Sequence, residues 1–465
     1  MLTAGDIAAA TRGRLLAGDP DRVVEGFSID SRTLRAGDLF IAIRGERFDG
    51  AAFVRDSLAA GACGVMIGAG AGASALAAQP GAPVVIEVAD TTTALQELGR
   101  HVRRQSGACV TAITGSAGKT TTKETAAEFL AARYTVYRNR GNLNNHIGLP
   151  LSLLDLRARP EVAVVELGMN HAGEIRRLVE LAEPETRVWT NVGDAHLGFF
   201  SGPDEIAEAK AEILEGATAR SLLVANADDP RVMRHAARFA GRTTTFGTGE
   251  AADVRAGQVE DLGPAGTRST LSTPRGRANL RVPLVGRGNL LNVLAAAAVA
   301  LAMDVPLETI VERAAGLRPA RHRGEVVALR DGVTLVDDSY NSSPAALKGA
   351  LGVLAADRQH ARRVAVLGEM LELGRFAVDL HQECGRAAAA AGVAELIAVG
   401  GPPAEALAAA AREAGLGARA RHVATSTEAA PIAAGSIRPG DLVLVKGSRG
   451  IGTELVVDRI RAEWS

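Results

Sequence analysis

The chain has 465 residues, 47% of them hydrophobic and 23% charged, which is ordinary for a soluble globular protein and long enough for about three domains. A formal net charge of −1 and an aromatic content of 3% argue against a nucleic-acid partner, because they provide neither a basic field nor stacking platforms. The cysteines Cys63, Cys109 and Cys384 are few and far apart, so neither a disulfide framework nor a zinc cluster is predicted.

The N-terminal stretch carries Asp6, Arg12 and Arg14 among apolar residues. This pattern predicts an amphipathic helix and not a signal peptide. The longest apolar run, 293–303, is too short to span a bilayer. We therefore expect a cytoplasmic protein with no membrane contact.

Residues 1–105 are predicted to form a small α/β domain. Helices are expected at 2–11, at 51–60 and from an N-cap at Asp90 to about 105, and strands at the start of 27–32 and at 38–45, 64–68 and 84–88. The stretch 68–81 is rich in Ala, Gly and Ser and is predicted to be a loop or a weak helix.

Residues 106–318 alternate between strand and helix patterns, which predicts a central domain with a parallel sheet. Its first strand, 109–113, runs into a glycine loop and a helix over 121–133. The loop has the form G-x-x-G-K-T, shorter than the usual P-loop, whose first glycine would stand at Ile113. The alternative is a plain Gly/Ser/Thr turn before a helix.

The glycine loop carries the residue types that hold a nucleoside triphosphate. Gly115 and Gly118 allow a tight turn whose backbone N–H groups can face a phosphate. Lys119 adds a point charge for the β/γ-phosphates, and the Thr120 hydroxyl suits Mg²⁺. The loop therefore predicts an ATP site.

Two polar residues follow buried strands of the central domain. Glu166 interrupts the apolar strand 161–168, and His196 comes after the strand 187–193. Ligands sit at the carboxyl ends of such strands, so Glu166 is a candidate metal ligand and His196 a candidate for a metal or phosphate role. The alternatives are a structural carboxylate that caps the following loop and an ordinary half-buried histidine.

Further along, a helix is predicted over 203–216, in which Lys210 reads as a solvated charge. A strand is expected at 222–226, and short polar β-like segments over 243–285. Asn289 lies near the start of a long alanine-rich helix, where its amide could read a base edge or cap the helix.

Residues 319–465 are predicted to form a third domain, a second doubly wound sheet without a phosphate loop. Strands are expected at the start of 333–344 and at 363–370, 396–400 and 442–447, with alanine-rich helices between them. The whole chain is thus expected to be an α/β protein in which a P-loop-type parallel sheet domain is flanked by a small N-terminal α/β domain and a C-terminal Rossmann-like domain. Such an arrangement suits a kinase or ligase that brings two substrates to ATP.

These residues together resemble the Mur ligases, the ATP-dependent amide ligases of peptidoglycan precursor synthesis. The shortened loop at 114–121 looks like the family's own ATP loop, and the blocks 141–148, 166–170 and 286–292 are similar to further family blocks. The segment 336–344, and 367–374 followed by His381, resemble the member that adds D-alanyl-D-alanine. The family member that adds a diamino acid carries a "YAH"-type segment at the position of 336–344. The pair of N-terminal motifs at 30–32 and 45–50 is shared by that member and the one that adds D-alanyl-D-alanine.

The resemblance implies a defined reaction. The carboxylate of UDP-N-acetylmuramoyl-tripeptide attacks the γ-phosphate of ATP to give an acyl phosphate. The amine of D-alanyl-D-alanine then displaces phosphate through a tetrahedral intermediate. A cytoplasmic monomer that requires ATP and Mg²⁺ is expected.

The resemblance also implies roles for individual residues. The ATP site would comprise Thr114, Gly115, Ser116, Ala117, Gly118, Lys119, Thr120 and Thr121, with Asn289 on adenine. Asp337 or Asp338, with Tyr340 and Asn341, would line the nucleotide and incoming-amine side. Mg²⁺ would be held by Thr120, Glu166, His196 and Lys210, the last carbamylated, and catalysis would rest on Lys119, Glu166, His196 and Lys210. The UDP-linked substrate would be bound by Asp30, Ser31, Arg32, Asn144 and Asn145.

The chain departs from the family pattern at two places in the third domain. Ser342-Ser343 stands where Ala-Asn is more frequent, and Arg375-Phe376 stands where acidic residues are common. Three alternatives remain at this stage: a diamino-acid ligase, a folate or other polyglutamate ligase, and a non-enzymatic ATP-dependent switch. The N-terminal domain with Asp30-Ser31-Arg32 argues against the polyglutamate ligase.

Overall fold

The computed structural model describes residues 2–45, 48–77 and 83–465. Two positions of the 45–50 motif, Glu46 and Arg47, and the end of the predicted 68–81 loop lie outside the described residues. The chain forms two compact units. The first contains Met1–Ala112, Tyr134–Met169 and Glu174–Pro184, and the second contains Ile113–Arg133, Asn170–Gly173 and Glu185–Ser465.

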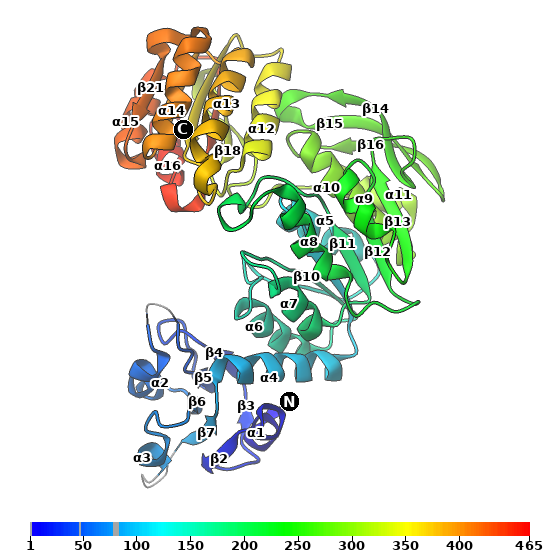
Figure 1. Cartoon of the computed structure of the whole chain (residues 1–465), viewed down its shortest axis with the longest axis vertical. Coiled ribbons are helices and arrows are strands. Elements are labelled where there is room, and N and C mark those ends of the chain that lie inside the picture. The colour runs from blue at the N-terminus through cyan, green and yellow to red at the C-terminus, as the bar shows by residue number, and fades with distance from the viewer. Residues whose placement is uncertain (1, 46–47, 78–82) are drawn as a thin grey trace. The chain divides into compact units, whose positions relative to one another are not determined.

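The first unit is built on a five-stranded sheet, ordered β2-β7-β6-β5-β4, in which only β2 is antiparallel to its neighbour (Figure 1). Its elements are β1 Leu2–Thr3, α1 Ala4–Thr11, β2 Arg14–Ala17, β3 Val23–Val24, β4 Gly26–Ser28, β5 Asp38–Ile41, η1 Gly50–Phe53, α2 Val54–Ala59, β6 Gly64–Gly68, α3 Ala73–Ala77, β7 Val84–Val88, α4 Thr91–Ser106, β9 Val136–Arg138, α6 Gly148–Leu154, η2 Asp155–Ala158, β10 Val162–Glu166 and α7 Glu174–Ala182. Strands β9 and β10 pair in parallel.

Helix α4 connects the N-terminal sheet to α6 and α7 within this unit. Asp90 caps it as predicted, because the Asp90 carboxylate accepts from the Thr93 N–H at 2.7 Å. Arg103 is buried in α4 and donates to the carbonyl groups of Ala182 and Glu183, at 2.7 and 2.8 Å. These bonds satisfy carbonyls at the end of α7.

The second unit begins within β8 Cys109–Thr114 and contains two sheets. In the first sheet, β16-β15-β14-β13-β12-β11 are neighbours in that order, and β11 to β14 are parallel. Its elements are α5 Lys119–Leu130, β11 Thr186–Trp189, η3 Leu197–Phe199, α8 Pro203–Ala211, η4 Glu212–Leu214, β12 Leu222–Asn226, α9 Pro230–Ala236, β13 Arg242–Gly247, β14 Val254–Asp261, η5 Gly263–Ala265, β15 Thr267–Thr273, β16 Gly276–Val282, α10 Arg287–Ala302 and α11 Leu307–Ala315. Helices α5 and α10 pack against each other.

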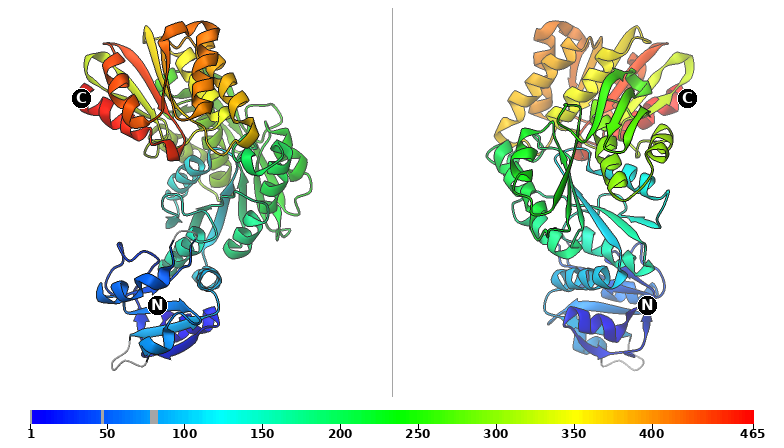
Figure 2. Two further views of the ribbon diagram at one scale, coloured as in Figure 1. Left: turned by 60° about the vertical axis from the view of Figure 1, so that its left-hand side comes forward. Right: turned by 90° about the vertical axis from the view of Figure 1, so that its right-hand side faces the viewer.

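The second sheet has six strands, ordered β17-β18-β22-β19-β20-β21, and only the edge strand β17 is antiparallel. Its elements are β17 Glu325–Ala328, η6 Arg330–Gly332, β18 Thr334–Asp338, α12 Pro344–Ala356, β19 Arg362–Gly368, η7 Gly374–Phe376, α13 Ala377–Ala390, β20 Glu395–Val399, α14 Pro402–Ala411, η8 Arg412–Leu416, η9 Gly417–Arg419, β21 Ala420–Val423, α15 Ser426–Ser436, β22 Asp441–Lys446, η10 Arg449–Ile451 and α16 Glu454–Trp464. Helices cover both faces of this sheet (Figure 2).

The predicted α/β class is confirmed, and the strands at 64–68, 84–88 and 222–226 have the predicted bounds. Three local predictions were wrong. The first helix starts at Ala4, because Thr3 caps it by accepting from the Asp6 N–H. The helix predicted over 203–216 ends at Ala211 and continues as a 3-10 turn. Strands β14, β15 and β16 are antiparallel, since their short connections cannot cross over as parallel pairing demands.

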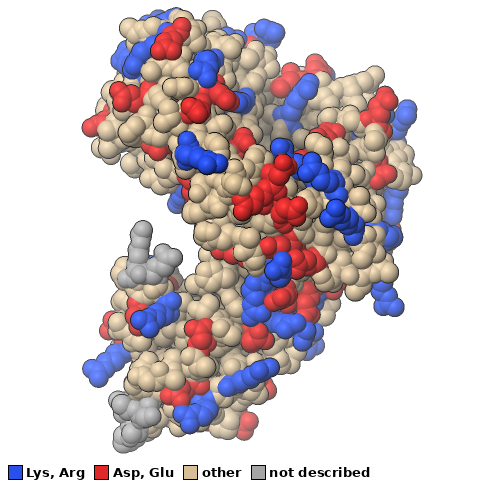
Figure 3. Space-filling model, in the orientation of Figure 1, with Lys and Arg blue, Asp and Glu red and all other residues tan. Residues whose placement is uncertain are grey.

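Lys and Arg are interspersed with Asp and Glu on the face drawn in Figure 3, in keeping with the formal net charge of −1. Among the described residues, no helix combines the length and the apolar character that crossing a membrane requires. The predicted domain limits at 105/106 and 318/319 stay a prediction.

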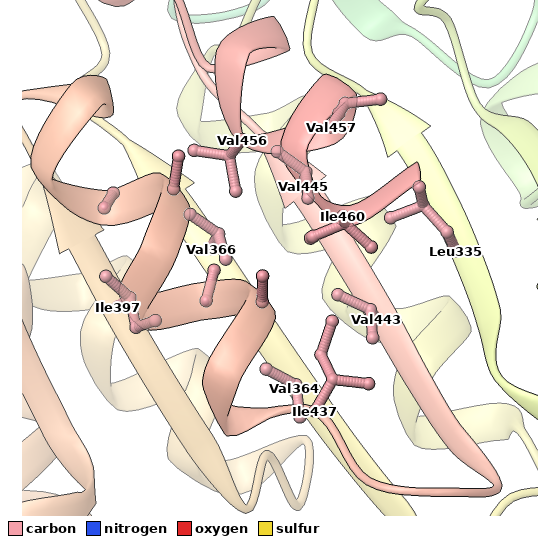
Figure 4. Close-up of a cluster of buried hydrophobic side chains, with 14 of the residues drawn as sticks. Leu335, Val364, Val366, Ile397, Ile437, Val443, Val445, Val456, Val457 and Ile460 are labelled. Carbon is pink, nitrogen blue, oxygen red and sulfur yellow. The ribbon is translucent and has the colours of Figure 1, made fainter. Parts of the chain in front are cut away.

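The core beneath α15 and α16 gives a stability prediction. Ile460 is fully buried there against strand residues such as Val443 and Val445 (Figure 4). Replacing Ile460 with alanine is expected to destabilise this part of the chain by about 2–5 kcal/mol, because it removes buried methylene groups and leaves a cavity. Chemical denaturation followed by tryptophan fluorescence measures the loss, since Trp464 packs against the same cluster. Leu455→Ala is the matched control: Leu455 is 49% exposed on the same helix, so a loss as large as that of Ile460→Ala would contradict the explanation.

Candidate functional site

The glycine loop between β8 and α5 has a backbone that only glycine allows at two positions. Gly115 has φ +149° and Gly118 has φ +84°. A Cβ on Gly115 would lie 1.9 Å from Thr190 Oγ1, and one on Gly118 would lie 2.0 Å from Asn292 Oδ1. The predicted tight turn is therefore present, and both glycines are required by space as well as by conformation.

The loop is fixed by the residues that follow β11. The Asn191 side chain accepts from the Ala117 N–H at 2.9 Å and donates to the Ala117 carbonyl at 3.1 Å. Thr190 Oγ1 donates to the same carbonyl at 2.7 Å. The Ser116 N–H donates to the Asn191 carbonyl at 3.0 Å. Such a network holds the loop in one shape before any ligand binds, which reduces the entropy that binding must overcome.

The loop leads directly into the N-terminus of α5. Gly118 is the N-cap and has no side chain to occupy the first-turn N–H groups, so the positive end of the helix dipole faces the loop. The Lys119 ammonium donates to the Gly115 carbonyl at 2.7 Å, which places its charge over the same loop. Backbone donors, a helix N-terminus and a lysine fit the polyphosphate of a nucleotide.

Lys210 does not lie in solvent, so its reading as a solvated charge was wrong. Its residue surface is 1% exposed, on the face of α8 that also buries Ile206. Burial lowers the pKa of Lys210 well below its ordinary value, and the nearby charge of Lys119 acts in the same direction. A lowered pKa favours the neutral amine, which is the form that reacts with carbonyl carbon.

His196 is half-buried at the start of η3, in the second unit with Lys119 and Lys210. Its Nδ1 lies 2.7 Å from Glu372 Oε2. Burial lowers the pKa of His196. The hydrogen bond to Glu372 opposes this effect, and the charges of Lys119 and Lys210 add to it. The segment before His196 is tied to the glycine loop, since the Gly193 N–H donates to Ser116 Oγ at 2.9 Å.

Asn289 and Asn292 form a chain on the first turns of α10. The Asn292 amide donates to Asn289 Oδ1 at 3.2 Å, and the Asn289 amide donates to the Val285 carbonyl at 2.8 Å. Gly286 is the N-cap of this helix, so the capping alternative for Asn289 was wrong. Because Asn292 touches Gly118, the pair is continuous with the glycine loop.

The carboxyl end of β18 carries the predicted residues Asp338, Tyr340 and Asn341. The buried Lys446 ammonium donates to Asp338 Oδ2 at 2.6 Å and to the Asn341 carbonyl at 3.0 Å. The guanidinium groups of Arg323 and Arg449 lie 4.0 and 5.3 Å from the Tyr340 ring centroid. Asp337 is fully buried, where it bonds His322 and Ser339.

Glu166, Asn144 and Asn145 belong to the first unit. Glu166 is 1% exposed at the end of β10, and its Oε2 is 3.4 Å from the Asn144 amide nitrogen. Asn145 is exposed and accepts from the Ile147 and Gly148 N–H groups, at 3.2 and 2.8 Å, at the start of α6.

Asp30, Ser31 and Arg32 form a surface turn in the same unit. The Arg32 guanidinium donates to both Asp30 carboxylate oxygens, at 2.9 and 2.7 Å, and its side chain is 86% exposed. This fork lowers the pKa of Asp30 to about 2. The turn therefore presents a planar, always charged group to solvent, which suits recognition of a phosphate.

The oxygen donors among the predicted ligands are suited to Mg²⁺. The Thr120 hydroxyl and the Glu166 carboxylate are hard oxygen donors, whereas Lys210 is suited only after its nitrogen becomes part of an anionic group. Among the described residues, no three His, Cys, Asp or Glu side chains cluster as a complete metal site. Mg²⁺ usually takes one or two carboxylates and completes its shell with substrate phosphates and water, so the residues fit an ion that arrives with ATP.

Three buried or paired residues were missed by the sequence reasoning. Lys446 ends a strand directly after the apolar run Leu442 to Val445, a signal similar to the one that singled out Glu166. Lys123 is fully buried on α5 and pairs with Glu124 at 3.1 Å. Glu372 had no comparable signal, since it bonds a histidine 176 positions away.

Comparison with known proteins supports one family across the chain. Three family models match: the Mur ligase family catalytic domain at 23–103, the Mur ligase middle domain at 113–300, and the Mur ligase glutamate ligase domain at 322–449. A Bacillus subtilis UDP-N-acetylmuramoyl-tripeptide–D-alanyl-D-alanine ligase is 34% identical over 82% of each chain.

Solved structures agree with the sequence relatives. A crystal structure of MurF from Acinetobacter baumannii has a TM-score of 0.86 at 32% identity and covers 99% of both chains. MurF ligase from Thermotoga maritima in complex with ADP has a TM-score of 0.82 at 27% identity and covers 95% of this chain and 98% of its own. The predicted three-part architecture and the resemblance are confirmed, and the chain belongs to the Mur ligase family.

Proposed function

We propose that this chain joins D-alanyl-D-alanine to UDP-N-acetylmuramoyl-tripeptide at the expense of ATP, in the synthesis of peptidoglycan precursors. The observation that carries this function is the likeness over nearly the whole chain to ligases of that name and structure. The glycine loop with Lys119 supplies the corresponding polyphosphate chemistry. ATP is a substrate that activates the acceptor carboxylate as an acyl phosphate, which the dipeptide amine then attacks.

Each site residue has a proposed task in this reaction. Residues 114–121 are assigned to the β/γ-phosphates, which the positive N-terminal end of α5 and the Lys119 ammonium hold while they stabilise the charge that grows on the transferred group. Thr120 and Glu166 would each serve as an oxygen ligand of Mg²⁺, and His196 and a carbamylated Lys210 would hold a second ion. When bound, these ions neutralise phosphate oxygens. The buried position of Lys210 supports its inclusion, since an uncompensated charge there would be costly.

The remaining tasks concern recognition. We assign Asn289 to adenine, and Asp338, Tyr340 and Asn341 to the nucleotide and the incoming dipeptide. The bond between Asp338 and Lys446 supports this assignment, because it holds the carboxylate at the carboxyl end of its strand. The exposed Arg32 fork supports the assignment of Asp30, Ser31 and Arg32 to the uridine diphosphate end. Asn144 and Asn145 are assigned to the same substrate.

The function is tested by mass spectrometry of the product. Incubation with ATP, Mg²⁺, UDP-N-acetylmuramoyl-tripeptide and D-alanyl-D-alanine is expected to give the UDP-linked pentapeptide, with phosphate released only when both acceptor and dipeptide are present. Phosphate release with a diamino acid and none with the dipeptide would identify the other ligase of the family. Nucleotide binding without any amide product would favour an ATP-dependent switch.

We propose three further properties of the protein, namely its oligomeric state, its domain limits and its location. We propose a monomer, which light scattering at the chain mass of 48.0 kDa would identify. We propose domains at 1–105, 106–318 and 319–465, which limited proteolysis tests by the positions of its cuts. We place the reaction in the cytoplasm, where ATP is available, and cell fractionation tests that location.

A further inference from the structure

His196 is bonded by a residue that lies far away in sequence. His196 is the N-cap of η3, after β11, and Glu372 lies in the loop between β19 and η7. The Glu372 carboxylate meets His196 Nδ1 at 2.7 Å, and the side chains are 21% exposed for His196 and 45% for Glu372. A loop that follows a strand of the six-stranded sheet therefore forms a hydrogen bond with a residue that follows β11.

Both residues adopt a left-handed backbone conformation, which residues other than glycine rarely adopt. His196 has φ +68° and Glu372 has φ +63°. The Gly198 N–H donates to the Glu372 carbonyl at 2.7 Å, and a Cβ on Gly374 would lie 2.8 Å from Gly198 Cα. The two loops are thus held in close backbone contact. Conformations of this kind persist where the surroundings enforce them, often at functional sites.

The bond also determines which imidazole nitrogen carries the proton. A glutamate carboxylate is ordinarily ionised at neutral pH, and in that form it can only accept a hydrogen bond. Nδ1 must then be the donor, and Nε2 keeps its lone pair. A carboxylate behind a histidine commonly sets the tautomer and ring orientation of a ligand in this way.

We propose that Glu372 is a positioning residue of the ligation reaction: it fixes the tautomer and orientation of His196, three residues after Gly193, whose N–H donates to Ser116 of the glycine loop. The proposal rests on the proposed function, in which His196 serves the phosphate site, and it adds a residue of the C-terminal sheet to that site. Since Glu372 and the phosphate loop lie on different sheets, the histidine is correctly oriented only while η3 and the 369–374 loop stay in contact.

Variants of Glu372 test this role, because a positioning residue is expected to affect kcat and the KM for ATP differently. Glu372→Ala and Glu372→Gly are expected to lower kcat about tenfold or more with the KM for ATP little changed. The glycine variant relieves the backbone, so its loss cannot be attributed to strain. Glu372→Gln keeps an oxygen that accepts from Nδ1–H and is expected to retain more activity than either. Glu463→Ala, which removes the carboxylate of an exposed ion pair with Arg459, is the control and should match the wild type.

A double-mutant cycle and a spectroscopic readout separate positioning from general damage. Adding Glu372→Ala to His196→Ala should cost nothing further, whereas additive losses would overturn the proposal. Nitrogen-15 NMR of histidine side chains should show His196 as the Nδ1–H tautomer in the wild type and a shift toward Nε2–H in Glu372→Ala. An unchanged tautomer would also overturn it. This readout needs no turnover, so a wild type that makes no pentapeptide would contradict the proposed function alone.

Discussion

Replacing Lys119 with alanine is expected to lower the rate of pentapeptide formation by about 10³-fold or more, with the fold unchanged. The reason is the position of its ammonium, which lies over the glycine loop within 2.7 Å of the Gly115 carbonyl. No other side chain of the loop carries a positive charge. In the proposed reaction the negative charge of the transferring phosphoryl group would therefore lose its nearest positive partner. Steady-state phosphate release and product mass spectrometry measure the loss.

The fold of the Lys119 variant should be retained, because Lys119 is only half-buried at the first position of α5. Circular dichroism and the thermal midpoint should therefore match the wild type. Lys348→Ala is the matched control: it removes a lysine that is 44% exposed and paired with Glu383, and it should leave turnover unchanged. Turnover near the wild-type rate in Lys119→Ala would show that the loop assignment is wrong.

Much of this architecture could be predicted because its signals are local. The glycine loop is contiguous, and buried parallel strands such as Leu222–Asn226 appear as apolar runs between turns. The edge strands β17 and β21 were not predicted, since each is only four residues long and neither is an apolar run of buried residues.

The predicted site was less accessible to such reasoning, for two different physical reasons. Lys210 stands four residues after Ile206 and three before Ile213, so helical geometry places it on their apolar face; this signal was present and was overlooked. The bond between His196 and Glu372 leaves no such trace, because it joins two loops that are 176 positions apart in sequence. Periodicity reports which face a residue occupies, but it does not report which distant loop meets it.

Lys210→Ala is expected to lower the ligation rate by about 10²-fold or more, and added formate or acetate is expected to restore part of it. Lys210 is 1% exposed, and burial together with Lys119 lowers its pKa, which favours the neutral amine, the form that can add CO₂. The addition of CO₂ to the neutral amine forms a nitrogen–carbon bond and releases one proton, which gives an anionic oxygen ligand. Alanine leaves space in which a small carboxylate can supply the same oxygens.

Three measurements decide whether Lys210 acts in this way. Carbon-13 NMR after incubation with labelled bicarbonate should show a carbamate carbon in the wild type and none in Lys210→Ala. Rescue should depend on the size of the acid, since the space left by a lysine admits formate and acetate more readily than larger acids. Lys348→Ala should show neither loss nor rescue. Full activity in Lys210→Ala would mean that the buried amine only fills space, and loss without rescue would assign it a role as an amine. Only a loss of ligation activity with size-dependent rescue agrees with a buried Lys210 that acts as an anionic carbamate.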